Sequence, residues 1–263
     1  MSDKDAANVG STEKSNTGEV RARLLQRSLR VIQLLADMKG RAKLQEICNK
    51  SGLSRATALR ILRTFMDFEF VEYDSVTRFY SIGPGFFQLS SNALESNTLV
   101  RNGQKLLNAL RDETGETACL FQQRGNDRYC IASANSHHEL GMNIEPGQRR
   151  PIFAGSPGRI LVMGLTEEFR DRIINSGTEL ERSKYDEECA SLSSNGVVVS
   201  HDEIIQGATA IAVPVTNAVG SIDTSLAIIG PSVRLKLELV KKFQKFVRDA
   251  GAELSGHRRT TNN

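Results

Sequence analysis

The sequence predicts an α+β protein of two domains, in which a basic set of helices closed by a hairpin precedes a domain with a mainly antiparallel sheet. Three observations lead to this prediction. The chain has 263 residues, which is long for one minimal domain and comfortable for two. Residues 21–83 hold no proline, whereas all six prolines lie at Pro84 or later. Apolar residues recur with helical spacing in the first stretch and form strand-like runs in the second.

Charge is divided unevenly between these two parts. Between Arg21 and Gly83 there are twelve Lys and Arg residues but only six Asp and Glu, so this stretch carries +6. The whole chain carries +3, so the remainder sums to −3. A basic domain beside a mildly acidic one indicates that the first domain meets a polyanion and the second does not.

Bulk features exclude several classes of protein. No run approaches the roughly 18 apolar residues that a bilayer-spanning helix needs. Residues 1–20 are polar and lack both an apolar signal region and hydrophobic periodicity, so we expect a disordered tail, no membrane contact and a cytoplasmic protein. The four cysteines show no CxxC spacing and are expected to be reduced thiols.

The N-terminal domain is expected to span residues 21–83 and to hold three helices and a hairpin. The apolar residues with helical spacing are Leu25, Leu29, Ile32 and Leu35, then Leu44, Ile47 and Cys48, then Ala58, Ile61, Leu62 and Phe65. Gly40 ends the first helix, the turn Ser51-Gly52-Leu53 follows the second, and Ser54 is a good N-cap for the third, over 54–68. β-prone runs at 70–73 and 78–82 flank a polar turn. This order is that of a winged helix-turn-helix domain, a DNA-binding fold.

Residues 84–113 continue with helical spacing, in which Leu106, Leu107 and Leu110 share one face. Asn97–Thr98 and Gly103 interrupt the pattern, so we expect a bent linker helix. Residues 114–257 then alternate between strand-like and helical runs. We expect one hairpin from 118–123 and 128–134, a second from 208–215 and 222–229, and a long last helix beginning near Pro231.

The third helix has the composition of a helix that reads DNA. Its apolar face packs into the core. On the remaining faces, three arginines are available to contact guanine bases, and hydroxyl groups are available to contact phosphates or thymine methyls. One arginine on a helix is more often part of a solvated face, but the ordered combination with the turn and the basic hairpin favours DNA. The residues expected to contact DNA are Ser54, Arg55, Thr57, Arg60, Arg63, Thr64, and, on the hairpin, Arg78 and Tyr80. Arg21, Arg23 and Arg27 are expected to add phosphate contacts.

Motifs along the whole chain resemble one known family. The segments SLRVIQLLADMKG, LQEICNKSGLSRATALRILRTF and RFYSIG look like the DNA-binding domain of IclR-family transcriptional regulators. The segments PIFAGSPGRILVMGL and GATAIAVPVTNAVGSIDTSLAIIGP are similar to the second domain of the same family. The likeness covers roughly residues 24–255 and rests on the order of the motifs. Ala56 stands where the family commonly has Ser.

This resemblance implies a GAF-like second domain that binds a small-molecule effector, in a protein that forms dimers or tetramers. The effector pocket would be lined by Met142, Gly155, Ser156, Pro157, Ser200, Ala210, Ala227 and Ile229. Members of the family that bind small oxoacids have polar side chains at the last four of these positions. In this sequence, only Ser200 among those four is polar. A highly polar ligand would lose about 1–3 kcal/mol for each group left unpaired. For Ala227 and Ile229, a place in the ordinary core is an equally good interpretation.

We therefore expect a larger, moderately apolar effector, such as an aromatic carboxylic acid. Its carboxylate would meet backbone N–H groups of the 155–158 loop at a helix N-terminus, with help from Arg149, Arg150 or Arg159. No cofactor is expected. His137, His138 and His201 are not expected to bind metal, since adjacent histidines on a strand point to opposite sides.

The resulting interpretation is a transcriptional regulator of a catabolic operon, a repressor or a dual regulator, that binds a near-palindromic operator. One alternative is an architectural DNA-binding protein without a ligand, which would not need a globular domain of this size. The other is a hydrolase that uses Ser156 in Gly155-Ser156-Pro157-Gly158. That segment lacks the GxSxG spacing of a nucleophile elbow, and Pro157 removes an oxyanion-hole N–H, so we expect no enzyme.

Overall fold

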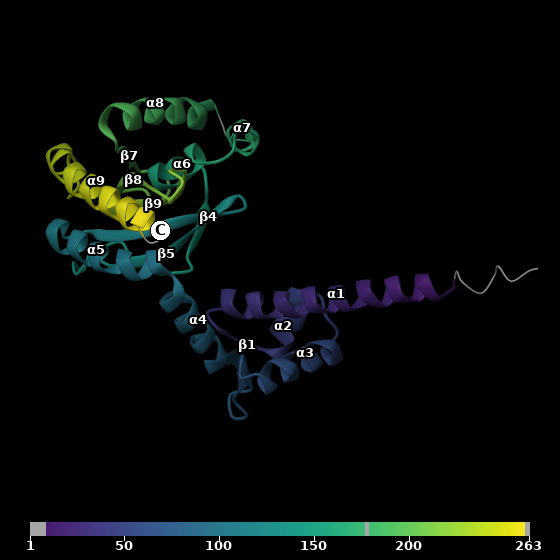
Figure 1. The fold of residues 1–263 in the computed structure, drawn as a ribbon. Coiled ribbons are helices and arrows are strands. Elements are labelled where there is room, and N and C mark those ends of the chain that lie inside the picture. Colours follow the sequence, from purple (N-terminus) through teal and green to yellow (C-terminus); the bar gives the residue numbers. More distant parts are fainter. Residues whose placement is uncertain (1–8, 177–178, 261–263) are drawn as a thin grey trace, which may run out of the picture. The chain divides into compact units, whose positions relative to one another are not determined.

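The protein has the α+β architecture that the sequence predicts (Figure 1). The computed structural model describes residues 9–176 and 179–260. The chain divides into two compact units, with the division between Leu94 and Glu95. None of the helices in the described ranges combines the length and apolar character needed to cross a bilayer.

The first unit holds the predicted helices and hairpin, with one additional strand. Its elements are α1 (Val9–Asp37), β1 (Arg41–Lys43), α2 (Leu44–Ser51), α3 (Arg55–Asp67), β2 (Val71–Tyr73), β3 (Phe79–Ile82) and α4 (Pro84–Ser96). The strands form an antiparallel sheet in the order β1-β3-β2. We did not predict β1, because three residues with a single apolar side chain give no readable alternation.

The start of α1 differs from the prediction of a disordered tail over residues 1–20. Residues 1–8 lie outside the described part of the chain, but α1 already begins at Val9. Val31, Ile32 and Leu35 anchor the other end of this helix in the core. Once a helix is anchored, each further residue adds a backbone hydrogen bond without a new nucleation cost, so polar sequence can extend it. Of the predicted apolar stripe, Leu25 and Leu29 are exposed.

Local capping fixes the turn between α2 and α3. Gly52 ends α2 in the left-handed region, at φ +69°, and donates its N–H to the carbonyl of Cys48 at 2.9 Å. Glycine adopts this conformation without steric cost. Ser54 then accepts the N–H of Thr57 at 3.3 Å, as an N-cap of α3. The helix buries Ala58, Ile61 and Leu62 as predicted and leaves its other side exposed.

The predicted linker over residues 84–113 is two helices, which separate at Asn97. The side chain of Asn97 caps α5 (Thr98–Thr114) by accepting the N–H groups of Leu99 and Val100. Gly103 does not interrupt α5; a Cβ there would lie 2.6 Å from the Leu120 side chain, so glycine permits close packing. Because Leu99, Leu107 and Leu110 lie in the core of the second unit, α5 is a structural helix of that unit rather than a linker.

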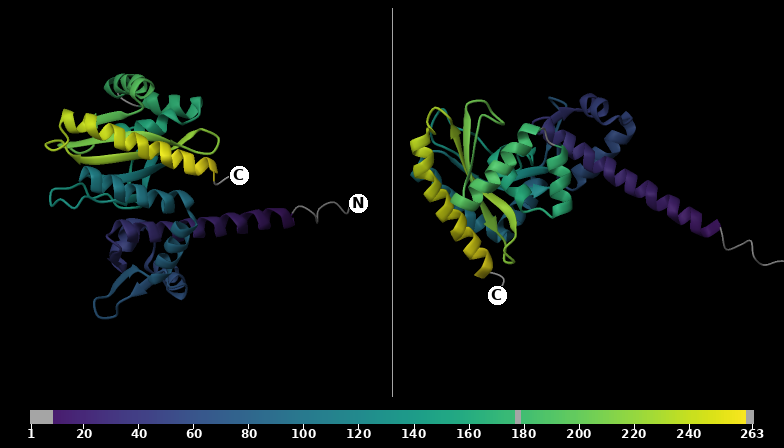
Figure 2. Two further views of the ribbon diagram at one scale, coloured as in Figure 1. Left: turned by 60° about the vertical axis from the view of Figure 1, so that its left-hand side comes forward. Right: turned by 90° about the horizontal axis from the view of Figure 1, so that it is seen from above.

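The second unit is a six-stranded antiparallel sheet with helices on both faces (Figure 2). Its strand order is β6-β5-β4-β9-β8-β7. Besides α5, its elements are β4 (Thr117–Arg124), β5 (Asp127–Ala134), β6 (Arg149–Pro151), α6 (Gly155–Met163), α7 (Glu167–Ser176), α8 (Glu179–Asn195), β7 (Val198–His201), β8 (Ala208–Thr216), β9 (Ile222–Pro231) and α9 (Leu237–Thr260). The edge strands β6 and β7 were not predicted, because each has only three or four residues.

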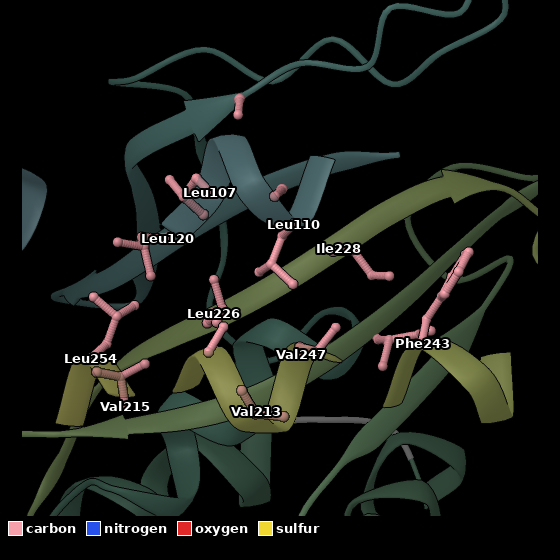
Figure 3. Close-up of a cluster of buried hydrophobic side chains, with 14 of the residues drawn as sticks. Leu107, Leu110, Leu120, Val213, Val215, Leu226, Ile228, Phe243, Val247 and Leu254 are labelled. Carbon is pink, nitrogen blue, oxygen red and sulfur yellow. The ribbon is translucent and has the colours of Figure 1, made fainter. Parts of the chain in front are cut away.

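Side chains of β9 alternate between two cores. Leu226 and Ile228 enter the core beneath α5 and α9, where Leu107, Leu110 and Val247 meet them (Figure 3). The intervening Ala227 enters the core beneath α6, α7 and α8. Since successive side chains of a strand point to opposite faces, both faces of the sheet are buried.

Candidate functional site

The exposed side of α3 forms the first candidate surface. Arg55, Arg60 and Arg63 are exposed on it, as are Ser54 and Thr64, and Thr57 is half-buried. The Thr64 hydroxyl donates to the carbonyl of Arg60, 3.1 Å away, so it is partly satisfied by its own helix. The six residues of this segment that the sequence assigned to DNA contact therefore lie together on one accessible helix.

The hairpin places its two predicted residues differently. Arg78 is exposed and adopts a left-handed φ of 60° at the turn. Asp74 holds this turn by accepting the N–H groups of Val76 and Thr77 and the Thr77 hydroxyl, and these bonds lower the pKa of its carboxyl. Tyr80 is 8% exposed, and its ring lies 4.7 Å from that of Tyr73.

Burial of Tyr80 has a clear structural cause. Tyr80 is the second residue of β3 and pairs with Ala42 of β1 and Tyr73 of β2. Burial, followed by the nearby Tyr73, raises the pKa of its phenol. Tyr80 is thus part of the core of the first unit and supports the hairpin, which leaves little of its side chain for the expected contact with the DNA backbone or minor groove.

A basic hollow lies beside the start of α3. Of the two arginines that line it, the sequence assigned only Arg27 to phosphate contact. Arg27 and Arg30 of α1 line it together with Ser54 and Thr57. Both arginines lie one turn apart on α1, so they share a face of that helix. The spacing of Arg30 from Arg27 is the sequence signal that could have identified it. An anion in this hollow would meet two cations near a helix N-terminus.

The second unit holds a pocket of about 660 Å³, part of which is open to solvent. Ser200, Ala210 and Ile229 form one row across its floor, because Ser200 pairs with Ala210 on β8 and Ala210 pairs with Ile229 on β9. Met142, Gly155 and Pro157 also line the pocket. Six of the eight positions that the resemblance pointed to therefore surround one cavity.

The other two predicted positions lie outside the lining. Ala227 is two residues before Ile229 on β9, in the next row, where it pairs with Ala212 and is fully buried in the core. Of the two interpretations that the sequence allowed for Ala227, pocket lining or ordinary core, its position matches the second. Ser156 lies directly behind the pocket and is also fully buried.

Hydrogen bonds of Ser156 join α6 to β7 and β8. Its backbone N–H donates to the Ser200 hydroxyl at 2.9 Å, and its own hydroxyl donates to the carbonyl of Ala210 at 3.3 Å. Gly155 precedes it at φ +67°, and a Cβ there would lie 3.2 Å from Ile204. The first turn of α6 thus offers few free donors, since the Ser156 N–H is used and Pro157 has none.

Apolar side chains form much of the pocket wall. They come from β4, from the 141–148 loop and from the 202–207 loop, and they are Phe121, Ile144, Ile204 and Ile205. The polar lining is larger than the sequence indicated. Besides Ser200 it includes Arg128, Asn143, Gln148, Arg150, Glu203 and Thr209.

Arg159 was expected to assist a ligand, but the structure gives it two carboxylate partners. Its guanidinium donates to Glu188 of α8 at 2.6 Å and to Glu203 at 2.6 and 2.9 Å. Burial opposes the charge, yet the bonds to Glu188 and Glu203 outweigh this effect and raise the pKa of Arg159. Arg159 therefore ties α6 to α8 and to the loop that carries Ile204.

Arg128 is a pocket residue that sequence reasoning missed. It lies on β5, in which Arg128, Cys130, Ala132 and Ala134 alternate as buried residues. A charged residue at an inward position of an alternating strand is unusual, and that is the signal that could have identified it. Of the arginines considered from sequence, Arg150 lines the pocket and Arg149 does not.

Within the described residues, no cluster of three His, Cys, Asp or Glu side chains is arranged to hold a metal ion. The four cysteines are free thiols. Cys119 and Cys130 are buried on the face of the sheet that carries the pocket. Burial raises the pKa of Cys130 to about 11.

Two family models match the chain, and together they cover most of its length. Residues 24–75 match the IclR helix-turn-helix domain, and residues 91–256 match the bacterial transcriptional regulator IclR C-terminal domain. The second match alone includes more than half of the chain.

Individual proteins support the same assignment. The HTH-type transcriptional regulator BhcR of Paracoccus denitrificans is 25% identical, with coverage of 94% of this chain and 90% of the relative. The HTH-type transcriptional repressor AllR of Escherichia coli K12 is 24% identical, with 89% of each chain covered. The crystal structure of an IclR transcriptional regulator from Alicyclobacillus acidocaldarius superposes with a TM-score of 0.80 at 27% identity, over 89% of this chain and 98% of that one. The chain therefore belongs to the IclR family of bacterial transcriptional regulators.

Proposed function

We propose that this protein is a repressor of a catabolic operon. It leaves its operator, or changes its arrangement on it, when a carboxylic acid binds in the second unit. The observation that carries the DNA-binding half of this proposal is the single accessible face of α3. Arg55, Arg60 and Arg63 extend from a helix whose opposite face is fixed in the core. A helix of this kind fits the major groove, where arginine pairs with guanine.

Phosphate contacts would set the register of α3 on the duplex. Arg78 at the hairpin turn and the hollow of Arg27 and Arg30 are exposed or accessible cations on the same unit. Such contacts fix position and orientation but carry no sequence information. We assign Tyr80 a supporting role in this scheme, because its ring is buried.

The operator would be near-palindromic, since a symmetric dimer presents two copies of α3 to successive major grooves. A homodimer is the smallest assembly that meets this requirement, and a tetramer would add a second pair. Effector binding would act by favouring one arrangement of the paired domains over another, which requires different affinities for the two states.

A moderately apolar carboxylic acid, such as an aromatic acid, is the effector class that the pocket lining supports best. Phe121, Ile204 and Ile229 supply apolar contact, whereas cationic and amide side chains supply a limited number of polar ones. This combination suits an organic acid with a substantial apolar body. A small oxoacid would leave much of the apolar wall in contact with water.

The experiment that tests this function uses the full chain and the DNA that flanks its own gene. Footprinting and fluorescence anisotropy should detect a protected near-palindromic site whose affinity falls steeply as salt rises from 50 to 200 mM, because phosphate contacts release counterions. A panel of aromatic and aliphatic acids should include compounds that raise the melting temperature and weaken operator binding. Operator binding with no response to any small molecule would indicate the architectural alternative. No salt-dependent affinity for any duplex would overturn the proposal.

A further inference from the structure

The structure contains two buried arginines near the pocket, and they differ in their partners. Arg159 is 1% exposed and is held by the carboxylates of Glu188 and Glu203. Arg128 is 2% exposed, yet no carboxylate among the described residues lies within ion-pair distance of it. A buried charge ordinarily has an ionic partner, because removing it from water is costly.

The protein satisfies Arg128 only in part. Its Nη1 donates to the carbonyl of Pro151 at 3.0 Å and to the carbonyl of Ala154. The guanidinium lies 5.2 Å from the centre of the Phe121 ring, which is a cation–π contact. Nε is buried without a hydrogen-bond partner, and within the described residues Nη2 has none either. A guanidinium has five N–H donors, so several remain unused beside the pocket.

The surroundings of Arg128 are positive rather than negative. Burial, with smaller contributions from nearby Arg150 and Arg159, lowers its pKa to about 10, so it stays a cation at neutral pH. Gly158 packs against it so closely that a Cβ there would lie 2.4 Å from Nη1. The fold therefore brings to the end of the pocket where α6 begins a cation that has no counter-ion among the described residues.

We propose that Arg128 binds the carboxylate of the effector, through the guanidinium donors that Pro151 and Ala154 leave free. This inference rests on the proposed function and names the residue that recognises the acid. Arg128, rather than the backbone N–H groups of the 155–158 loop, is then the main anchor of the carboxylate, since the Ser156 N–H already donates to Ser200. The ligand class is an organic monocarboxylate whose apolar body contacts Phe121 and Ile229.

The proposed pairing is chemically favourable for both partners. Hydrogen bonds between a guanidinium and a carboxylate are charge-assisted and stronger than neutral ones. The ligand would supply the anion that this buried cation lacks. A neutral ligand of the same shape would leave the charge unpaired, so the pocket should distinguish an acid from its amide.

The test compares acids with their primary amides on the wild type and on Arg128→Gln. The probes are benzoate, 4-hydroxybenzoate, phenylacetate, 4-hydroxyphenylacetate and hexanoate, screened by thermal shift and measured by calorimetry. We expect at least one acid to bind the wild type about 10- to 100-fold more tightly than its amide, and to lose about the same factor in Arg128→Gln. Arg128→Lys should fall between the two. The control is Arg149→Gln, an exposed cation on β6 that pairs with Asp127 at 3.1 Å outside the pocket lining, and it should bind within about twofold of the wild type.

The glutamine retains an amide donor for the Pro151 or Ala154 carbonyl, and a cooperative urea unfolding transition followed by circular dichroism checks that the variant is folded. Should Arg128→Gln fail to fold, the Arg128 Nε–H signal in ¹⁵N-arginine-labelled wild type gives a direct readout, and it should shift when the acid is added. Acid that binds Arg128→Gln as tightly as the wild type would overturn the assignment, as would an unmoved Nε–H signal. A wild type that binds only the amides, or none of the acids, would overturn it too. Each of these results leaves salt-dependent operator binding intact, whereas loss of that binding would disprove the proposed function itself.

Discussion

The hydroxyl of Ser200 on β7 accepts the backbone N–H of Ser156 at 2.9 Å and lies 3.0 Å from the Ser156 hydroxyl. This contact joins residues 44 positions apart and fixes the first turn of α6 against the floor of the pocket. Both residues are buried, Ser156 fully and Ser200 with 6% of its surface exposed, so the bond is largely shielded from water.

Replacement of Ser200 by alanine should therefore reduce the free energy of unfolding by about 1–3 kcal/mol, because the buried Ser156 N–H loses its acceptor. Urea denaturation followed by circular dichroism measures the change. Ser193→Ala is a matched control, since its exposed hydroxyl only donates to a carbonyl of its own helix at 3.0 Å, and it should change stability by less than about 0.5 kcal/mol. Equal effects of the two substitutions would contradict a special role for the Ser156–Ser200 bond.

Removal of the buried cation at position 159 should be more damaging. Arg159→Met leaves Glu188 and Glu203 close together without their shared partner, and we expect a loss of about 3–5 kcal/mol. Arg170→Met serves as the control, because Arg170 and Asp171 form a solvent-accessible pair at 3.9 Å, which is worth less than about 1 kcal/mol. Thermal and urea unfolding measure both. A loss below about 1 kcal/mol in Arg159→Met would mean that the triad is not the clamp that the geometry indicates.

Substitution of Arg60 tests the DNA-contact face. Arg60→Ala should weaken specific operator binding by about 1–3 kcal/mol, or roughly 5- to 150-fold, because a guanine contact is lost. The melting temperature should not change, since the side chain is exposed. Lys241→Ala removes an exposed cation from α9 of the second unit and should leave affinity unaltered. Unchanged affinity in Arg60→Ala would show that the wrong face of α3 has been assigned to DNA.

Arg30 is expected to behave as a phosphate contact rather than a base contact. Arg30→Ala should weaken binding to specific and random duplexes by a similar factor and reduce the slope of log affinity against log salt by about 1. Anisotropy titrations at four salt concentrations give this slope. A loss confined to the specific operator would instead place Arg30 in sequence recognition.

Alkaline pH should destabilise the second unit through Cys130. Burial raises the pKa of this thiol from 9.0 to about 11, so the folded state holds its proton more strongly than the unfolded state. The stability from this group is therefore complete below pH 9 and is lost as the pH rises through 11. Cys130→Ala should lose less stability than the wild type between pH 8 and pH 11, with Cys48→Ala as the comparison. Identical pH dependence in wild type and Cys130→Ala would refute this contribution.

The sequence by itself determined the elements and much of the candidate site. Helical spacing, the glycine at 52 and the N-cap at 54 are local signals, so they define α2, α3 and the turn between them without reference to the rest of the chain. Strand-like runs of six to eight residues likewise predicted the strands β4, β5, β8 and β9. The exposure of Arg55, Arg60 and Arg63 on α3 followed from the same spacing, because the opposite face of the helix is buried in the core.

Tertiary structure alone decided features that depend on pairing between distant segments. The three- and four-residue strands β1, β6 and β7 exist only because a longer strand lies beside them, and Tyr80 is buried because β1 and β2 flank its strand. Whether an inward residue lines a cavity or fills the core depends on its row in the sheet, which separates Ile229 from Ala227. The difference between Arg128 and Arg159 is also one of partners. Both are buried arginines, but folding brings Glu188 and Glu203 to Arg159, whereas no carboxylate in the described part of the chain lies within ion-pair distance of Arg128.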